Sequence, residues 1–420
     1  MNYRKSLLTA LLAPLIALGA ATGAQAAGYA VFTHGASALG QGNAVTAHSD
    51  NPSTIFYNPA LINKLEGTQF QFGTTAIFSS REFESSATGA RTSNDSVFFP
   101  STFYATHKFN DSLSAGLGVF NPFGLGTEWD EEWEGRFLAT KSELTTFNIN
   151  PVLSYRVIPS LAIAAGLDVI LLDATLEKRV PAGAFGLAGP ATETGVQFKG
   201  DGTGVGFNVG VAWDACKTVT IGASYRSEVK VDIDGTSRTS PTFTVPFFNV
   251  TPLDSKGETS VKLPQQITAG ISYQVTAPLI IEAGVRWEDW SAFKELQITL
   301  DNGTPLAATR RDWHDTYGLN VGGKYRVNDT VALLAGYVYG NDAVPNSTFD
   351  PSIPDSNTHV FCVGTDLNFE GINAAFSYAY QRYENRTKNN SVDPLLPPNY
   401  ADGVYKNDAH LLALSLGYKF

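Results

Sequence analysis

The sequence predicts an all-β protein, namely a transmembrane antiparallel β-barrel of about 14 strands with an N-terminal hatch inside its lumen. Three observations support this prediction: apolar residues alternate with small or polar ones, tight turns recur between long polar loops, and no apolar run after the first 26 residues is long enough for a membrane-spanning helix. The 420 residues include 39 Gly, 17 Tyr and 26 Phe, and only 16% are charged. Such a composition is typical of strands with one face in lipid and the other in a lumen.

The first 26 residues are expected to be a secretory signal peptide. Arg4 and Lys5 form its positive end, an apolar run extends from Leu7 to Leu18, and Ala24-Gln25-Ala26 resembles a cleavage site. An uncleaved membrane anchor is the alternative. With cleavage, the mature chain begins near Ala27 and lies outside the cytoplasm, where the outer membrane is the expected location.

The period-two alternation is clearest in the last segment of the chain. Leu412, Leu414, Leu416, Tyr418 and Phe420 point one way, and small or polar residues mostly point the other. Similar runs begin at Val205, Leu279 and Val331. The apolar face of these runs carries Tyr or Trp near an end, which favours a lipid-facing barrel with aromatic girdles over a soluble sandwich. A terminal Phe on a last amphipathic strand is also typical of outer-membrane proteins.

Turn signals give an independent strand count. Six tight turns alternate with seven long polar connections, which indicates fourteen strands within about two. The residues 68–420 are therefore assigned to the barrel. The tight turns are expected at Asn110-Asp111, Ile158-Pro159-Ser160, Ala215-Cys216-Lys217, Thr276-Ala277-Pro278, Asn328-Asp329 and Glu370-Gly371.

Residues 27–67 do not have a strand pattern. Their small residues, from Gly35 to Ala47, are followed by the helix-breaking steps Asn51-Pro52 and Asn58-Pro59. An internal hatch is predicted for this segment, and a flexible periplasmic leader is the alternative. The formal net charge of −11 argues against a nucleic-acid partner, and two distant cysteines make neither a disulfide framework nor a zinc site.

Several blocks of sequence resemble the FadL family of outer-membrane long-chain fatty acid transporters (OMPP1/FadL/TodX). They are spread over nearly the whole mature chain in the expected order. The blocks are Asp50 to Leu61, Asn121 to Trp129, Trp287 to Phe293, Trp313 to Tyr317, Asn341 to Pro345 and Ser352 to Asp355.

The resemblance implies a monomeric fourteen-stranded barrel that transports small hydrophobic ligands and sits among outer-membrane lipids. It implies that Asn58, Pro59 and Ala60 lie in the hatch and take part in gating. Ligand would be captured between two extracellular loops, pass to a deeper pocket and leave sideways into the membrane. Long-chain fatty acids are the expected substrate, but toluene and xylene carriers resemble the fatty acid carriers closely, so uptake of monoaromatic hydrocarbons is the alternative.

The loops 174–202 and 232–260 are expected to capture ligand, because they carry apolar residues that exposed loops usually avoid. Packing between the loops is an equally open explanation. The candidate residues are Phe185, Leu187, Phe243, Val245, Phe247 and Phe248.

A fatty carboxylate needs a cation in the deeper pocket. Lys178 is expected to face the lumen, and its surroundings resemble a family stretch that carries a carboxylate-binding Arg. The family's other basic ligand, a Lys, is replaced here by His314, which when neutral binds an anion poorly. An ordinary salt bridge in the lumen is the alternative for both residues.

Asn121, Pro122 and Gly124 end the alternation of the third strand. Because proline removes a ladder hydrogen bond, a lateral opening is expected here, and an ordinary loop start is the alternative. No catalytic site, cofactor or metal is expected, since the six His are scattered with no nucleophile motif. A general porin, the remaining rival, does not need a glycine-rich hatch.

Overall fold

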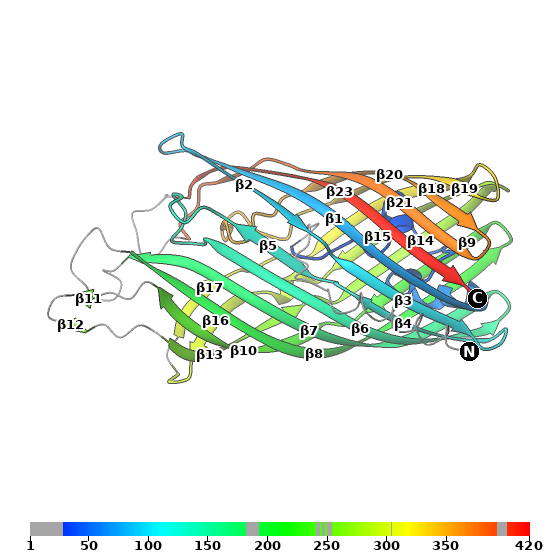
Figure 1. The fold of residues 1–420 in the computed structure, drawn as a ribbon, viewed down its shortest axis with the longest axis horizontal. Helices are drawn as coiled ribbons and strands as arrows, with labels where there is room; N and C mark the ends of the chain where they lie inside the picture. Colours follow the sequence, from blue (N-terminus) through cyan, green and yellow to red (C-terminus); the bar gives the residue numbers. More distant parts are fainter. Residues whose placement is uncertain are drawn as a thin grey trace, which may run out of the picture.

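The computed structural model describes residues 28–181, 193–240, 244–245, 248–249, 254–303, 305–392 and 401–420. The expected signal peptide lies outside these residues. The described chain forms a closed antiparallel barrel of 14 strands, which confirms the predicted fold class (Figure 1). The barrel closes where β1 (Thr68–Ser85) pairs with β23 (Gly403–Lys419), in a register that runs from Gln69 opposite Lys419 to Ser85 opposite Gly403.

Several barrel strands are interrupted, so that two labelled segments together make one strand. After β1, the strands are in order β2 (Arg91–Phe98) with β3 (Ser101–Lys108), β4 (Leu113–Phe120) with β5 (Gly124–Glu128), β6 (Lys141–Ile158), β7 (Leu161–Pro181), β8 (Glu193–Cys216), β9 (Val219–Arg226) with β10 (Val229–Ser240), β13 (Asp254–Leu263) with β14 (Gln266–Thr276), β15 (Leu279–Glu288) with β16 (Glu295–Leu300), β17 (Pro305–Arg310) with β18 (Thr316–Arg326), β19 (Val331–Gly340), β20 (Thr358–Phe369), β21 (Ile372–Tyr383) with β22 (Arg386–Lys388), and β23. The 3₁₀ turn η4 (Trp290–Ala292) follows β15, and β11 (Thr244–Val245) pairs with β12 (Phe248–Asn249) in a separate hairpin.

All six predicted tight turns connect neighbouring strands, and they gather at the end of the barrel that holds the C-terminus (Figure 1). The predicted bounds of two long loops are wrong. Residues 174–181 and 193–202 belong to β7 and β8, and residues 232–240 and 254–260 belong to β10 and β13. These strands continue beyond the lipid, where their outward residues become polar, so the end of the apolar pattern marks the membrane boundary and not the end of the strand.

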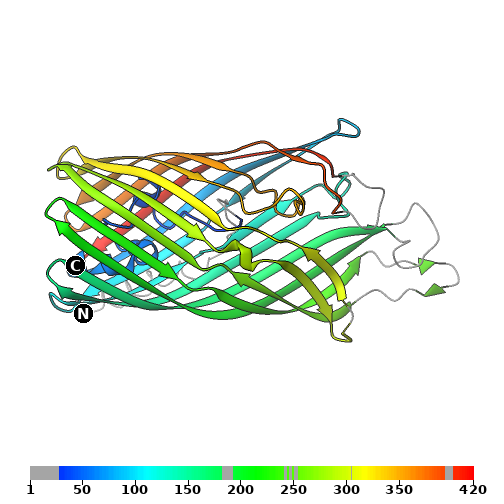
Figure 2. The ribbon, with the colours of Figure 1, turned by 180° about the vertical axis from the view of Figure 1, so that it is seen from behind.

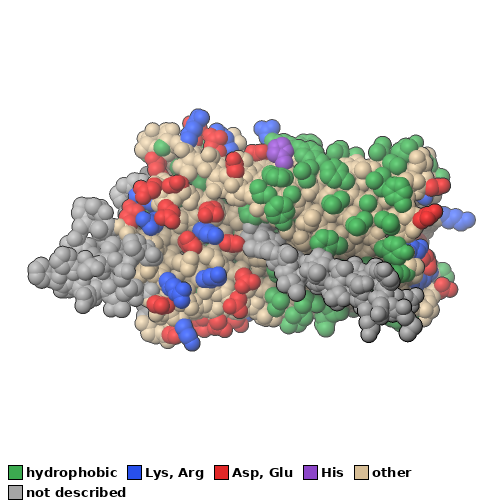
Figure 3. Space-filling view, in the orientation of Figure 1, with side chains coloured by type: hydrophobic (Ala, Val, Ile, Leu, Met, Phe, Trp, Pro, Cys, Tyr) green, Lys and Arg blue, Asp and Glu red, His purple; other side chains and the backbone are tan. Residues whose placement is uncertain are grey.

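The outward face carries an apolar belt over the half of the barrel nearer the tight turns. Leu414 is 54% exposed although it is apolar, and its neighbours in the belt are exposed in the same way. Figure 3 shows apolar side chains gathered over this half and charged side chains over the other. This division fits a barrel that is embedded in the outer membrane and projects beyond it. None of the described helices has the length and apolarity to cross a bilayer.

Residues 28–67, called the N-terminal segment below, lie inside the barrel (Figures 1 and 2). They form the short helices α2 (Ala36–Gly40), α3 (Thr54–Tyr57) and η2 (Pro59–Lys64). Wall glycines allow this close packing, because a Cβ atom on Gly322 would lie only 1.9 Å from the carbonyl oxygen of Gln41. A Cβ atom on Gly336 would lie 2.2 Å from backbone atoms of Gln41 and Gly42. Glycine is thus required at position 322 of β18 and position 336 of β19.

Candidate functional site

Glu282 on β15 fixes the middle of the N-terminal segment to the wall. Its fully buried carboxylate accepts hydrogen bonds from the backbone N–H groups of Thr46, Ala47 and His48 at 2.6 to 3.1 Å. The His48 ring nitrogen Nδ1 lies 2.7 Å from the same carboxylate. Backbone donors converging on one carboxylate hold the loop in a single position.

A second anchor is the buried ammonium group of Lys324 on β18. Its Nζ atom lies 2.5 Å from Asp50 of the N-terminal segment and 2.6 Å from Asp366 of β20. The Ser37 hydroxyl donates to Asp366 at 2.8 Å. Since Asp366 is almost fully buried, its charge depends on Lys324 and Ser37 for compensation.

Asn58, Pro59 and Ala60 lie together where the N-terminal segment meets β6 and β8. The Asn58 amide donates to the carbonyl oxygens of Thr46 at 2.8 Å and Val211 at 2.9 Å, and its side-chain oxygen accepts from the Ala60 N–H group. Asn58 therefore joins two parts of the N-terminal segment to the wall, and it also caps η2. The structure brings the three predicted hatch residues together, and their part in gating stays a prediction.

The third barrel strand is broken between Phe120 and Gly124. On the tight-turn side of the break, β4 pairs with β3 as far as Val119 opposite Phe103. On the long-loop side, β5 pairs with β6 and, within the described residues, with neither β2 nor β3. The wall thus loses its hydrogen-bonded ladder between the second and third strands. Asn121, Pro122 and Gly124 lie at this break, as the sequence predicted, and their use as an opening stays a prediction.

The N-terminal segment covers the break from inside. The Val31 N–H group donates to the Pro122 carbonyl at 3.0 Å, and the Gly124 N–H group donates to the Tyr29 carbonyl at 2.9 Å. An isolated antiparallel bridge joins Ala30 to Phe123. Residues 29–31 therefore take the place of the missing neighbour strand beside Pro122, Phe123 and Gly124.

An apolar cavity, called the outer pocket here, lies on the long-loop side of the N-terminal segment. It contains about 510 Å³ of empty space, including space open to solvent, and the surface that faces this space is almost entirely apolar. Lining residues include Tyr29, Leu176, Phe198, Val261, Phe293 and Arg311. Glu143 is a further lining residue, but its carboxylate lies 3.1 Å from the Lys141 ammonium group. A narrow apolar cavity of this kind suits an apolar ligand or the tail of an amphiphile.

Two lining residues of the outer pocket keep a buried donor without a partner. Neither the Tyr29 hydroxyl nor the Arg311 Nε atom has a hydrogen-bond partner among the described residues. Burial raises the pKa of the Tyr29 hydroxyl, so this group stays protonated and able to donate. The other nitrogens of Arg311 bind Asp350 at 2.5 Å and Ser352 at 3.1 Å, which fixes the guanidinium in place. Unpaired buried donors are costly, so each of these two groups requires an explanation.

Asp355, in the loop between β19 and β20, holds the start of the N-terminal segment. One carboxylate oxygen accepts from the N–H groups of Gly28 at 2.9 Å and Ala343 at 3.0 Å. Burial raises the pKa of Asp355 to about 7, and the nearby Asp342 charge acts in the same direction, while the backbone donors oppose both. The hold on Gly28 therefore depends on a group that titrates near neutral pH.

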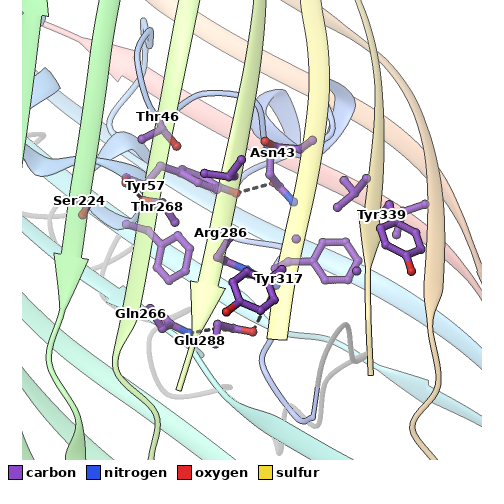
Figure 4. A pocket seen from close by; sticks show the side chains of 18 of the residues that line it. Asn43, Thr46, Tyr57, Ser224, Gln266, Thr268, Arg286, Glu288, Tyr317 and Tyr339 are labelled. Atoms are coloured by element: carbon purple, nitrogen blue, oxygen red, sulfur yellow. Dashed lines mark hydrogen bonds and ion pairs between the residues drawn. The ribbon is translucent and has the colours of Figure 1, made fainter. Parts of the chain in front are cut away.

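A second cavity, the inner pocket, lies between the N-terminal segment and the wall strands β9, β14, β15, β18, β19 and β20. It contains about 890 Å³ of empty space, including space open to solvent. Phe32, Phe56 and Tyr57 line it from the N-terminal segment, and Arg226 and Arg286 are among its wall residues (Figure 4).

Tyr29, which lines the outer pocket, packs its ring closely against that of Trp290. Their ring centroids are 4.6 Å apart, and Trp290 is fully buried. Tyr29 lines the outer pocket and Phe32, three residues later, lines the inner one. A short stretch of the N-terminal segment thus reaches from one cavity to the other.

Comparison with known proteins identifies the family. Residues 17–420 match the sequence model of the family described as outer membrane protein transport protein (OMPP1/FadL/TodX). The chain belongs to this family. Its members are outer-membrane transporters of hydrophobic compounds.

Two curated relatives show how far the similarity extends. Outer membrane protein P1 of Haemophilus influenzae is 25% identical over 470 residues, which cover 100% of both chains. A long-chain fatty acid transport protein of Escherichia coli is 26% identical over 387 residues, covering 84% of this chain and 86% of the relative.

Solved structures share the fold. The structure of a Pseudomonas aeruginosa FadL homologue has a TM-score of 0.83 at 19% identity, covering 94% of this chain and 100% of the other. The P. putida toluene transporter TodX has a TM-score of 0.74 at 17% identity, covering 92% of this chain and 98% of the other.

Against this family background, the two predicted basic ligand residues differ in position. Lys178 pairs with Val196 and lies two residues beyond the outer-pocket residue Leu176, so it belongs to the inward face of β7. Its side chain forms no ion pair within the described residues. His314 lines neither pocket. Its side chain is half exposed, and its Nε2 atom lies 3.6 Å from Asp342. The predicted lumen position of Lys178 therefore agrees with the register, whereas a pocket contact of His314 has no support in this geometry.

The predicted capture residues are only partly described. Phe185, Leu187, Phe243 and Phe247 lie outside the described residues. Val245 in β11 pairs with Phe248 in β12, which places these two residues opposite each other in a short hairpin. Capture of ligand by these residues stays a prediction.

Sequence reasoning missed Tyr29, Arg311 and Arg286. Arg311 lies three residues before His314, the basic residue of this block for which the family resemblance implies ligand binding. Tyr29 follows the predicted cleavage site closely, and nothing in its own neighbourhood indicates a pocket. Arg286 lies on the inward face of β15. Charged residues are common in the lumen of a barrel, so the sequence alone does not show that this one lines a cavity.

Proposed function

We propose that this barrel carries long-chain fatty acids across the outer membrane, and that the outer pocket binds the fatty acid during transport. The observation that carries the proposal is the combination of an apolar cavity with two unpaired donors, the Tyr29 hydroxyl and the Arg311 Nε–H group. An alkyl chain would fill the apolar lining, and its carboxylate would accept hydrogen bonds from both donors. Lys178 adds a positive charge two residues beyond the lining residue Leu176.

The physical benefit of such a route is a continuous apolar surface. Each CH₂ group of a fatty acid loses about 0.8 kcal/mol of favourable burial when it is exposed to water. A wide aqueous channel would not offset this cost, whereas an apolar pocket does. The proposal assigns transport to the protein and no chemical reaction.

Release is proposed to occur sideways at the break in the third strand. Support comes from the missing ladder between β5 and the second strand, β2 with β3, and from the N-terminal segment that covers the break. A ligand in the outer pocket contacts Tyr29, and the adjacent Ala30 bridges to Phe123 at the break. Displacement of Tyr29 would therefore weaken the cover of the break. Asn58 would limit how far the rest of the segment moves.

Uptake of radiolabelled oleate tests the proposal. A host that lacks its own fatty acid carrier should regain oleate uptake when it produces this chain. Lys178→Ala should weaken binding of oleate more than that of oleyl alcohol, its uncharged counterpart. If the host gains sensitivity to toluene without oleate uptake, the fatty acid assignment is wrong and the fold assignment is unaffected.

Uptake of monoaromatic hydrocarbons is the second candidate. It is favoured by the fold shared with the P. putida toluene transporter TodX and with the CymD monoaromatic hydrocarbon channel, which has a TM-score of 0.69 at 15% identity. A neutral hydrocarbon would leave the Tyr29 and Arg311 donors unpaired, so this candidate explains less of the pocket. A general porin is disfavoured by the N-terminal segment in the lumen. A large steady ion current through the reconstituted protein would reverse that preference.

A further inference from the structure

Arg286 is a cation of the inner pocket whose donors have no hydrogen-bond partner among the described residues. The nearest acid is Glu288, at 3.7 Å between Nη2 and Oε2, which is longer than a hydrogen bond. Arg286 thus helps to compensate the charge of the buried Glu288 without a hydrogen bond to it, and the hydrogen bonds to Glu288 come from Gln266 at 2.7 Å, Thr316 at 3.3 Å and Trp290 at 3.4 Å. The donors of Arg286 therefore remain available to a ligand.

The other arginine of the inner pocket is differently placed. The Arg226 guanidinium is hydrogen-bonded to the buried Asp168 carboxylate. It also lies 5.5 Å from the ring centroid of Phe56 and 5.4 Å from that of Phe120. Arg226 is thus neutralised and fixed by its surroundings. In the described lining of the inner pocket, this leaves Arg286 as the cation that can bind an anion.

Apolar side chains form part of the lining of the inner pocket, beside polar ones such as Asn43, Gln266 and Asn320. Phe32 and Phe56 come from the N-terminal segment, and Val338 and Val360 come from β19 and β20. In Figure 4 the Arg286 side chain lies between Tyr57 and Glu288. A free guanidinium beside an apolar wall matches a ligand that has an anionic head and an apolar tail.

We propose that the inner pocket is a second binding site for a monocarboxylate with an apolar tail, and that Arg286 binds its carboxylate. This inference rests on the proposed function and adds a second station to the route. The planar guanidinium can donate two parallel hydrogen bonds to a carboxylate. At this station the ligand touches Phe56 and Tyr57 of the N-terminal segment, whereas in the outer pocket it touches only Tyr29 of that segment.

Oleate and oleyl alcohol share the same tail and differ in charge, so together they test the proposal. Binding of each radiolabelled compound is measured on the full chain in lipid nanodiscs, with binding to empty nanodiscs subtracted. We expect two oleate equivalents on the unchanged protein. Arg286→Met should weaken the second equivalent by about 10- to 100-fold, the loss of a charge-assisted hydrogen bond. Oleyl alcohol binding should change less than about threefold, and Arg286→Lys should retain most of the oleate binding.

A variant of the outer pocket separates failure of this inference from failure of the proposed function. Leu176→Trp fills the outer pocket and should remove one oleate equivalent while leaving the Arg286-dependent one. One equivalent that is abolished by Leu176→Trp and unaffected by Arg286→Met would overturn the inner site alone. Absence of saturable oleate binding to the unchanged protein would overturn both proposals.

The position of the ligand is tested directly by diffraction. Crystals of the full chain soaked with a bromine-labelled fatty acid should show an anomalous peak in the inner pocket as well as in the outer one. A peak confined to the outer pocket would overturn the inference. Equal loss of oleate and oleyl alcohol in a folded Arg286→Met protein would do the same, since that result would mean a general change of shape. Heat-dependent migration on gels and the melting temperature establish that each variant is folded.

Discussion

Tyr29→Phe removes one hydroxyl group and leaves the ring in place. From the structure, we expect this change to leave the stability of the empty protein unchanged or raised, and to weaken ligand binding. The hydroxyl is buried with no partner among the described residues, and such a group costs about 1–3 kcal/mol. Its removal should therefore leave the stability of the empty protein unchanged or raise it. The ring keeps its contacts with Trp290, Phe293 and Trp313, since the aromatic geometry does not involve the hydroxyl.

The same change should weaken oleate binding. A hydrogen bond from a phenol to a carboxylate contributes about 1.5–3 kcal/mol, which corresponds to a loss of affinity of about 10- to 150-fold. Oleyl alcohol accepts only a neutral hydrogen bond of about 0.5–1.5 kcal/mol, so its affinity should fall by about tenfold or less. The measurements are melting temperature in detergent without ligand, and binding of both compounds in nanodiscs. A lower melting temperature together with unchanged oleate affinity would refute the reasoning, because Tyr29 would then have a structural role only.

Three other changes test the anchors of the N-terminal segment. The pKa of Asp355 is raised to about 7 in the folded protein, so its stabilising contribution is complete below its ordinary pKa of about 4 and is lost as the pH rises through about 7. Asp355→Asn should therefore reduce the change of melting temperature with pH between pH 4 and 8. An unchanged slope of melting temperature against pH would contradict this. Lys324→Met should cost about 3–5 kcal/mol in unfolding free energy, because it leaves the carboxylate of Asp366 buried and unpaired, and adding Asp366→Asn should restore part of it. Gly322→Ala should displace the N-terminal segment and raise ion conductance, since its Cβ atom would lie 1.9 Å from the Gln41 carbonyl oxygen, whereas Gly318→Ala on the same strand would meet nothing closer than 3.7 Å and serves as the control.

The barrel could be predicted because its information is local. Leu412, Leu414 and Leu416 alternate with small residues, and five of the six tight turns contain an Asn, Asp, Pro or Gly. These patterns depend only on residues that are close in sequence and on the contact of one strand face with lipid. They can therefore be recognised without knowledge of the tertiary structure. The break at Pro122 could be predicted for the same reason, since proline acts on its own strand.

The pockets could not be predicted, because they depend on which distant residues meet. Tyr29, Arg311 and Arg286 come from three separate parts of the chain, and only the closed barrel with its inner segment brings them to the cavities. The lengths of β7 and β8 were also missed. Both strands continue into water, where outward polar residues such as Glu177 erase the apolar alternation on which the prediction relied.

One short stretch of the N-terminal segment contacts both pockets and the break in the third strand. Tyr29 lines the outer pocket, Ala30 bridges to the broken third strand, and Phe32 lines the inner pocket. These residues are too close in sequence to move independently, so a ligand that displaces Tyr29 must also disturb the bridge at the break. Asn58, Glu282 and Lys324 hold the remainder of the segment to the wall. On the proposed route, a ligand would move the short part around Tyr29, the longer part would keep the lumen closed, and an apolar ligand would pass sideways without an aqueous channel.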